Sequence, residues 1–458
     1  MDHAHIRRRH FLGASLGLSA AGVAGGVLGA GAAETPAAAE KTKAVKQPAG
    51  TGWEKNEVIQ NARAAAIEIL KPSKKELEHG LRLHADSLVF ETYGFAPRAA
   101  VDGDAMRRAV EAGASDVELK DMREDMSMTR YATDPAERAE FVQAWEAAGV
   151  TCIFQNAGEE GQDPMRLIKR LARFTYATDM MPDFLPKAVT PDDVEAAKRQ
   201  GRHCLYFSGN GVPLTQQWLS VEDELRYVRV FFQLGIRMMH LTYQRRNMIG
   251  DGCGEKSNAG LSDFGRAVVA EMNRVGLIVD VAHAGWQTSL EGARASEKPM
   301  VASHTTCAAL NEHIRSKPDE VIRAIVDTGG LVGICCVPSF LGGTGDIAAM
   351  LDHVDHVAKK FGADHVGIGT DVAYTSRNAA AEQKKIPSRP RGRAEFRSLW
   401  PDDALTPPPG MHPKASQSLA WTNWPLFTVG LVQRGYSDEE IRKILGANML
   451  RVARAALA

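Results

Sequence analysis

The sequence lacks the features that mark several large classes of protein. Lys and Arg number 55 against 56 Asp and Glu, a formal net charge of -1, so no excess of positive charge favours nucleic acid or an anionic membrane. The six cysteines show no Cys-x-x-Cys spacing, which excludes a zinc ribbon and leaves a disulfide open. Beyond residue 33 no run is long and apolar enough to span a bilayer. We therefore expect a globular protein that does not bind nucleic acid.

The N-terminus is typical of an export signal. Three arginines, residues 7–9, precede Phe11 and a weakly hydrophobic stretch rich in Gly and Ala. This order is typical of a twin-arginine signal, and residues 30–32 offer a small-x-small cleavage site, although a membrane anchor is the alternative. We expect residues 1–33 to be removed on export and residues 34–60 to form a flexible lead-in. The mature protein would then be periplasmic or secreted, without stable membrane insertion.

From about residue 75 the sequence repeats a capped helix, a glycine and a short apolar strand. Asp134 and Pro135, for example, suit the start of a helix that ends near Gly149, where an apolar strand follows. Eight strands are expected on this basis, at residues 81–89, 150–154, 204–207, 236–242, 277–282, 300–303, 331–337 and 365–369. Strands that alternate with helices imply a parallel sheet, because each parallel connection needs a crossover.

This pattern predicts an α/β fold, a (β/α)8 TIM-type barrel over residues 61–458 with inserted loops and a C-terminal helix. A doubly wound open sheet is the alternative, but no G-x-G-x-x-G follows the first expected strand. Residues 91–133 and 375–415 are longer than a connecting loop needs, and the second is rich in Pro, Arg and Lys. We expect a solvated surface there, with a substrate lid as the alternative.

Polar residues at the ends of the expected strands indicate a metal site. His84 and Asp86 are two positions apart, so their side chains would share one face of a strand. Imidazole and carboxylate groups are the usual ligands of zinc and related ions. A single histidine in such a place is more often a hydrogen-bonded core residue. In a barrel, however, the strand ends form one rim, and it would also hold Ser208, Tyr243, His283, His304 and Asp371.

Several segments resemble the renal (membrane) dipeptidase family in sequence and in order. They are residues 84–86, 260–265, 280–283, 301–304, 315–319, 365–371 and 435–451. The resemblance implies a barrel metallohydrolase with two zinc ions that cleaves dipeptides and related amides. It also hints at a homodimer.

The same resemblance implies a role for each matching residue. His84 and Asp86 would hold one metal, and His283 and His304 the other. Arg315 would bind the substrate carboxylate, for which a guanidinium is well shaped. Asp371 would lie near the bridging water or the substrate amine and move a proton to the leaving group. Its alternative role is that of a packing or capping aspartate.

Two positions depart from the family pattern. Ser208 stands where the family has a glutamate that bridges the two metals, and a neutral hydroxyl cannot supply that negative charge. Asn210, on the same side of the strand, could offer an oxygen, directly or through water. Tyr243 stands where the family has a substrate-binding histidine, and it can donate a hydrogen bond but carries no positive charge at neutral pH. The nearby His240 is expected to point away, toward the surrounding helices.

We therefore expect an exported dipeptidase that uses one or two zinc ions, with a small peptide as its substrate. One alternative is a metallohydrolase of the same fold that acts on another small amide or a lactone. The other is a catalytically impaired barrel that only binds peptide or metal.

Overall fold

Eight parallel strands follow one another around a barrel in the order of the chain. The computed structural model describes residues 52–158, 163–389 and 399–458, and these strand bounds refer to that part of the chain. The strands are β1 (Phe90–Gly94), β2 (Cys152–Asn156), β4 (Cys204–Gly209), β5 (Ile236–His240), β6 (Ile278–Asp280), β7 (Val301–Cys307), β9 (Leu331–Ile334) and β10 (Val366–Ile368). Two short strands, β3 (Lys187–Ala188) and β8 (Ser316–Lys317), pair with β4 and β7.

The first and last strands of this order meet where the barrel closes. Just past β10, the backbone N–H of Asp371 donates to the carbonyl of Tyr93 on β1 at 3.4 Å. Inside the barrel, the hydroxyl of Thr92 donates to the carbonyl of Ser303 on β7 at 2.6 Å. The predicted (β/α)8 barrel is therefore confirmed, and the carboxyl ends of its strands form one rim.

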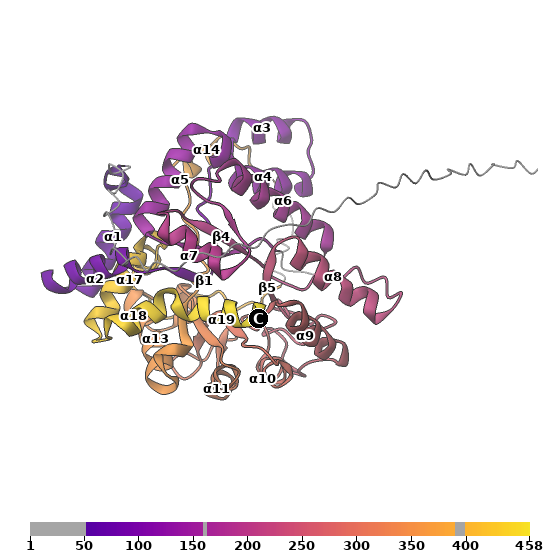
Figure 1. Ribbon diagram of the computed structural model, residues 1–458. Coiled ribbons are helices and arrows are strands. Elements are labelled where there is room, and N and C mark those ends of the chain that lie inside the picture. The colour runs from indigo at the N-terminus through magenta and orange to yellow at the C-terminus, as the bar shows by residue number, and fades with distance from the viewer. Residues whose placement is uncertain (1–51, 159–162, 390–398) are drawn as a thin grey trace, which may run out of the picture. The chain divides into compact units, whose positions relative to one another are not determined.

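Helices cover the outside of the strands (Figure 1). Those between β1 and β7 are α3 (Gly103–Glu111), α4 (Asp116–Thr133), α5 (Pro135–Ala148), α6 (Pro164–Met180), α7 (Pro191–Arg199), α8 (Val221–Gln233), α9 (Asp263–Val275) and α10 (Trp286–Ala295). Those after β7 are α11 (Asp319–Asp327), α12 (Pro338–Leu341), α13 (Ile347–Phe361), α14 (Ala379–Lys384), α16 (Ala415–Ser418), α17 (Trp424–Gln433), α18 (Asp438–Arg442), η4 (Lys443–Ala447) and α19 (Asn448–Leu457). The chain enters the barrel through α1 (Glu57–Leu70) and α2 (Lys74–Asp86). No helix among the described residues is long and apolar enough to cross a membrane.

The strand predicted over residues 81–89 is wrong, because this segment belongs mostly to α2. Ser73 and Glu76 form a capping box, in which each side chain accepts a hydrogen bond from the other residue's backbone N–H. The cap fixes the helix start and favours continuation through residue 86. The first strand begins at Phe90 instead.

The predicted start and end of the helix that follows Asp134 are confirmed. Asp134 caps α5 through its carboxylate, Pro135 is the first helical residue, and Gly149 ends the helix with a φ of 63°. On the buried side of α5, Trp145 is fully enclosed, and Phe141 stacks on Tyr131 with ring centroids 3.9 Å apart. Burial of one such aromatic side chain contributes roughly 3 kcal/mol. This packing fixes α5 against the barrel.

The predicted boundary at the amino end of the barrel domain differs from the structure. Helix α1 begins at Glu57, ahead of the predicted domain start at residue 61, and Asn56 caps it. The predicted export signal, residues 1–33, lies outside the described residues. At the other end, Ser437 and Glu440 form a capping box, and the predicted C-terminal helix runs from there through α19.

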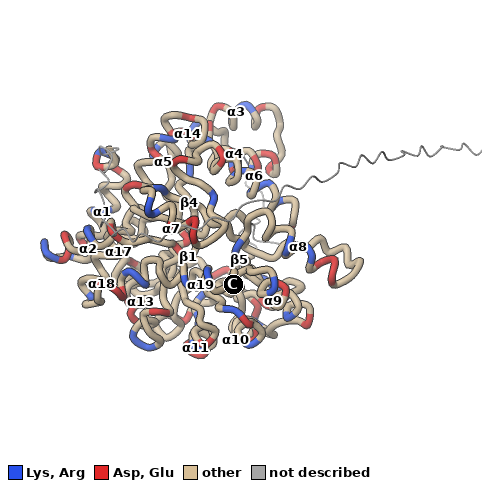
Figure 2. The backbone as a smooth tube through the Cα atoms, in the orientation of Figure 1, with Lys and Arg blue, Asp and Glu red and all other residues tan. Residues whose placement is uncertain are grey.

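Charged side chains of both signs are interspersed along the chain (Figure 2). One group of ion pairs joins α4 to α6, where Glu124 lies 2.9 Å from Arg170 and 3.1 Å from Arg173. These contacts hold the inserted α4 against the barrel helix α6. They also fix Arg170, which reaches the rim of the strands.

Candidate active site

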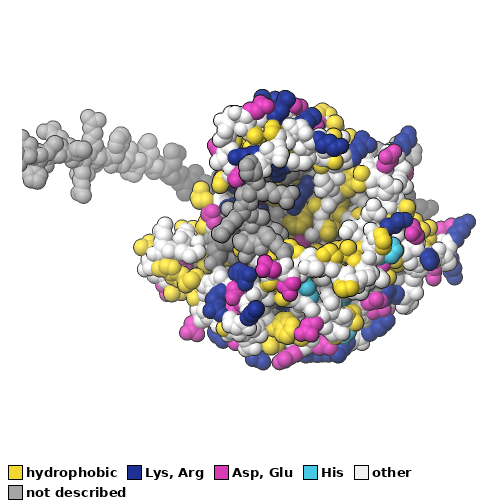
Figure 3. All heavy atoms as spheres, turned by 180° about the vertical axis from the view of Figure 1, so that it is seen from behind, with side chains coloured by type: hydrophobic (Ala, Val, Ile, Leu, Met, Phe, Trp, Pro, Cys, Tyr) yellow, Lys and Arg dark blue, Asp and Glu magenta, His cyan; other side chains and the backbone are white. Residues whose placement is uncertain are grey.

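A cavity of about 330 Å³ lies at the carboxyl ends of the strands. This is the face on which active sites of (β/α)8 barrels occur. The surface is hollowed on one face, where hydrophobic side chains gather (Figure 3). Polar and aromatic residues from many parts of the barrel line the cavity, among them Tyr93, Asn156, Asn210, Tyr243, His283 and Asp371. Further out it is lined by Phe95, Arg98, Arg170 and Trp400.

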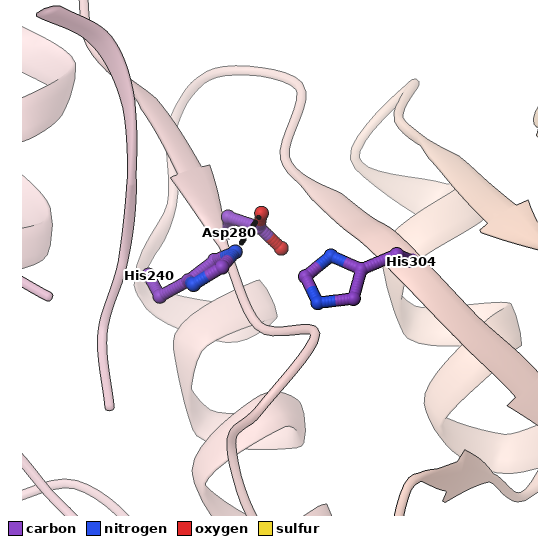
Figure 4. A group of neighbouring side chains, drawn as sticks. All are labelled: His240, Asp280 and His304. Carbon is purple, nitrogen blue, oxygen red and sulfur yellow. Dashed lines mark ion pairs between the residues drawn. The ribbon is translucent and has the colours of Figure 1, made fainter. Parts of the chain in front are cut away.

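A cluster of fully buried ligand-type side chains comes from three neighbouring strands (Figure 4). His240 ends β5, Asp280 ends β6, and His304 lies within β7. Their ligand atoms all lie within 4.8 Å of one another. His283 follows β6, and its Nε2 lies 2.9 Å from Nε2 of His304. The cluster therefore meets the cavity at His283.

Backbone contacts orient Asp280 within this cluster. Its Oδ1 accepts hydrogen bonds from the backbone N–H groups of Ala282 and Ser303, at 2.9 and 3.0 Å. Its Oδ2 is left to face Nε2 of His240 at 2.7 Å. Burial raises the pKa of Asp280, but His240 and Ser303 outweigh this and hold it below its usual value. Asp280 is thus a carboxylate with one oxygen anchored and one directed into the cluster.

Both histidines at the cavity floor are held neutral. Burial lowers the pKa of His283 and of His304 well below the usual value, and the nearby Arg315 guanidinium lowers both further. The Nδ1 atom of His304 lies 2.8 Å from the Ser303 hydroxyl, which fixes the orientation of the ring. Neutral imidazole is the form that binds a metal ion.

The cluster fits a divalent metal ion of the zinc type. Two ring nitrogens, Nδ1 of His240 and Nδ1 of His283, are buried without a hydrogen-bond partner, and Oδ2 of Asp280 faces only Nε2 of His240, at 2.7 Å. Buried polar atoms without partners are costly, and an ion bound within the cluster would satisfy part of this need. Two nitrogens bound to one tetrahedral zinc lie about 3.3 Å apart, close to the separation of the two Nε2 atoms. Nitrogen and carboxylate oxygen are also the donors that such ions prefer.

Two tyrosine rings cover the histidines. Tyr93 stacks on His304 with centroids 3.9 Å apart, and its hydroxyl donates to Oδ1 of Asn210 at 2.5 Å. Tyr243 stacks on His283 with centroids 4.3 Å apart. The imidazole planes are thereby fixed on the cavity side as well.

Asp371 lines the cavity in a strained backbone conformation. Its φ of 57° lies in the left-handed region, which few residues other than glycine adopt without cost. Burial raises the pKa of Asp371 to about 6, although Arg315, His240 and Arg98 act in the opposite direction. A carboxyl group with this pKa can both accept and donate a proton near neutral pH.

Arg315 lies beside the cluster and is fully buried. Its Nη2 donates to the carbonyl of His304 at 2.8 Å, and the guanidinium lies over the Phe340 ring. Its Nε and Nη1 atoms have no hydrogen-bond partner. The side chain therefore retains two donors for a further group.

His84 and Asp86 do not join this site, so the prediction that they bind metal is corrected. Both lie on α2. The ring nitrogens of His84 lie 2.8 Å from the Thr428 hydroxyl and 2.8 Å from the Ala148 carbonyl. Ala148 ends the helix that leads into β2, so His84 lies at the amino end of the strands, opposite the cavity. Asp86 is exposed at the end of the same helix.

Ser208 and Asn210, the two residues near the position of the family's bridging glutamate, have different surroundings in the structure. The Ser208 hydroxyl donates to the carbonyl of Gln155 on β2 at 3.1 Å and is fully buried, so it is engaged within the sheet. Asn210 lines the cavity and accepts from Tyr93. Neither residue restores a carboxylate at this end of β4.

His240 belongs to the cluster, contrary to the expectation that it points toward the helices. That expectation extended the alternation of strand faces from Tyr243 back to His240. Strand β5 ends at His240, so the alternation does not apply to residues 241–243. The available signal was the mostly apolar segment 236–239, which is followed by a histidine just as the mostly apolar segment 277–282 is followed by His283.

Comparisons with known proteins agree with this architecture. A dipeptidase of Claviceps purpurea, tcpJ, is 27% identical over 281 residues, which are 60% of this chain and 56% of that protein. The chain thus matches little more than half the length of this relative. An amidohydrolase from Pseudomonas aeruginosa has a similar structure, with a TM-score of 0.58, 24% identity and coverage of 82% of this chain and 99% of that one.

The probable dipeptidase PvdM from Pseudomonas aeruginosa also has a TM-score of 0.58, at 18% identity, over 84% of this chain and 99% of that one. These two similar structures support the fold alone. The family itself is shown by sequence, because residues 113–382 match the profile of the membrane dipeptidases. That match covers β5, β6 and β7, which carry the ligand-type cluster, and β10, which Asp371 follows, and the chain therefore belongs to the membrane dipeptidase family, peptidase family M19.

Proposed function

We propose that this protein is a metal-dependent hydrolase that cleaves the peptide bond of short peptides. The observation that carries the proposal is the meeting of His283 and Asp371 at the floor of one cavity, with the ligand-type cluster directly beneath. Membership of the membrane dipeptidase family supports the same reaction. A divalent ion held by His283 and His304, for which we propose zinc, would polarise the scissile carbonyl and lower the pKa of water.

The chain's own residues supply proton transfer and orientation. We assign to Asp371 the proton that passes from water to the leaving amine, because its pKa is close to neutral. Arg315 would bind the substrate carboxylate through its two unpartnered donors. The Tyr243 hydroxyl, at the cavity wall, would donate a hydrogen bond to the substrate.

The size and charge of the cavity favour a small anionic peptide. A volume of about 330 Å³ is at the lower end of the range for ligand pockets, which suits a dipeptide better than a longer chain. Arg98 and Arg170 both line it. Arg170 is paired with Glu124, whereas Arg98 contributes a guanidinium that lies over the Phe95 ring. We therefore expect a preference for substrates with an acidic side chain.

A panel of dipeptides tests this function. The metal-loaded protein should release amino acids from dipeptides, and faster from those with an acidic residue. A matched protein with Asp371→Asn should bind the same metal but release them roughly 10²- to 10⁴-fold more slowly. If the wild-type protein hydrolyses no dipeptide with its metal in place, the dipeptidase assignment fails, and other small amides and lactones become the substrates to test.

We also propose export by the twin-arginine route, on the basis of residues 7–9 and the stretch that follows. Replacement of these three arginines by lysines keeps the charge but removes the twin-arginine signal. The variant should stay in the cytoplasm with its leader uncleaved. Export of the variant at the normal level would contradict this route.

A further inference from the structure

The ligand-type side chains at the floor of the cavity come from only one part of the barrel. His240, Asp280, His283 and His304 all belong to β5, β6, β7 or the turn after β6. Within the described residues, this part of the barrel contains the one group of three or more His, Cys, Asp or Glu side chains arranged to hold a metal. Two adjacent ions need more donors than these four, because each ion takes at least three protein ligands.

Apart from the arginines Arg98 and Arg170, the opposite part of the rim presents uncharged groups to the cavity. Tyr93 lies on β1, Asn156 is the last residue of β2, and Asn210 follows β4. Asn156 is engaged with the backbone, since its Oδ1 accepts from the N–H of Gly158 at 2.9 Å. Asp371, which follows β10, is the one acidic side chain among the described residues that line the cavity, so a second divalent ion would have a single carboxylate to compensate its charge in a buried setting.

The one carboxylate of β1 is also unavailable. The Oε1 atom of Glu91 accepts from both the backbone N–H and the hydroxyl of Thr370. Its Oε2 accepts from the indole N–H of Trp421 at 2.8 Å. Each oxygen of Glu91 is thus engaged in the wall of the barrel and not at the metal cluster.

Tyr93 occupies the space that a second ion would need beside His304. Its ring lies 15° from parallel to the imidazole, with centroids 3.9 Å apart, and is 1% exposed. The hydrogen bond to Asn210 fixes the hydroxyl end of the ring. An ion in this place would have to displace a buried, hydrogen-bonded aromatic side chain.

We propose that this protein binds one divalent ion per chain, held by His240, Asp280, His283 and His304, and that Tyr93 and Asn210 close the position of a second ion. This inference rests on the metal dependence proposed above and extends it. His240 takes the place of ligands from the first strand, since its Nδ1 has no hydrogen-bond partner and its Nε2 faces only Oδ2 of Asp280, at 2.7 Å. Four donors would complete a tetrahedral site, and catalytic zinc sites can expand to five-coordinate during the reaction.

Metal content and affinity test the proposal without a measurement of activity. The full-length mature protein, purified without chelator, should contain about one zinc per chain by elemental analysis, and calorimetric titration of the stripped protein with Zn²⁺ should give the same ratio. Two ions per chain would overturn the proposal, and so would none. One bound ion without hydrolysis of any peptide would leave this inference intact and contradict the proposed function.

A matched pair of variants tests the role of His240. His240→Ala should weaken zinc binding roughly 100-fold or more, since loss of a group that merely orients a ligand already costs about 10- to 100-fold. His203→Ala removes a half-buried histidine whose Nδ1–H donates to the Val150 carbonyl away from the cluster, and should leave affinity unchanged. Unchanged affinity in His240→Ala would remove His240 from the ligand set.

Cobalt(II) substitution provides a second readout should His240→Ala fold poorly. The visible absorption of the Co²⁺-loaded wild type should be that of a four-coordinate ion and saturate at one equivalent. His240→Gln, which keeps most of the side-chain volume, should change the shape of this spectrum. An identical spectrum in the variant would contradict coordination by His240.

Discussion

The phenol ring of Tyr93 lies on the imidazole of His304, with ring centroids 3.9 Å apart and the Tyr93 hydroxyl bonded to Asn210. The two rings come from β1 and β7, which are not neighbours in the order of strands. Their contact therefore crosses the interior of the barrel. It decides which side of His304 is open to a ligand.

This contact leads to a prediction about stability. Tyr93→Phe removes the hydroxyl and leaves Oδ1 of Asn210 buried without its donor, at a cost of about 1–3 kcal/mol in the free energy of unfolding. Asn210→Ala should cost less in the Tyr93→Phe background than in the wild type. A double-mutant cycle by urea denaturation would measure this coupling, expected at about 0.5–3 kcal/mol. Additive effects would mean that the two side chains do not interact.

A second prediction concerns Asp371. If it transfers the proton, Asp371→Asn should lower kcat by roughly 10²- to 10⁴-fold with little change in metal content. Because the wild-type group has a pKa of about 6 and acts first as a base, the rate should fall as pH drops below that value. Asp364→Asn, in the exposed turn before β10, is the control and should keep the normal rate. A normal rate in Asp371→Asn would exclude this role.

Arg98 provides a test of substrate choice. Arg98→Ala should raise KM for dipeptides with an acidic side chain by roughly 10- to 100-fold, because a hydrogen bond to a charged group contributes about 1.5–3 kcal/mol. Dipeptides with neutral side chains should change much less. Initial rates over a range of concentrations measure both, with the exposed Arg107→Ala as the matched control. An equal loss for acidic and neutral substrates would point to a structural role for Arg98.

The sign of a pH effect on stability follows from Glu91. Burial raises its pKa to about 8 in the folded protein, against an ordinary value of 4.5, even though hydrogen bonds from Thr370 and Trp421 lower it. Between these two values the folded state holds a proton that the unfolded state releases. The stability of the wild type should therefore fall as pH rises through this window, by up to about 1.4 kcal/mol per pH unit, and level off above it.

Glu91→Gln isolates this effect, because the amide does not titrate. The variant should gain stability relative to the wild type between about pH 5.5 and pH 8, whatever constant cost the loss of one hydrogen bond adds. Urea midpoints at both pH values measure the difference. A difference that stays the same at the two pH values would show that Glu91 does not change its charge there.

The last prediction separates His84 from the metal site. His84→Ala should leave zinc content at the wild-type level, because the side chain lies at the amino end of the strands. It should lower the free energy of unfolding by about 2–4 kcal/mol, since it leaves a cavity and removes hydrogen bonds to Thr428 and Ala148. Elemental analysis and urea denaturation measure the two effects. Loss of zinc from the folded variant would restore His84 as a ligand.

Local sequence patterns were sufficient for most of the fold. The cap at Asp134 and the capping box at Ser437 act within one turn of helix, so neighbouring residues decide them. Apolar runs between such helices identify parallel strands, and the barrel then places His283 and Asp371 on one rim. The sequence by itself therefore determined the barrel and the face on which the cavity lies.

Only the tertiary structure decided which side chains meet on that face. A His-x-Asp pattern has the same spacing in a strand and in a helix, and the capping box at Ser73 placed His84 on a helix at the opposite end of the barrel. The end of β5 brought His240 toward Asp280, and the crossing from β1 put Tyr93 on His304. These contacts join residues far apart in the chain, and their free energy comes from packing inside the barrel, which no local pattern records.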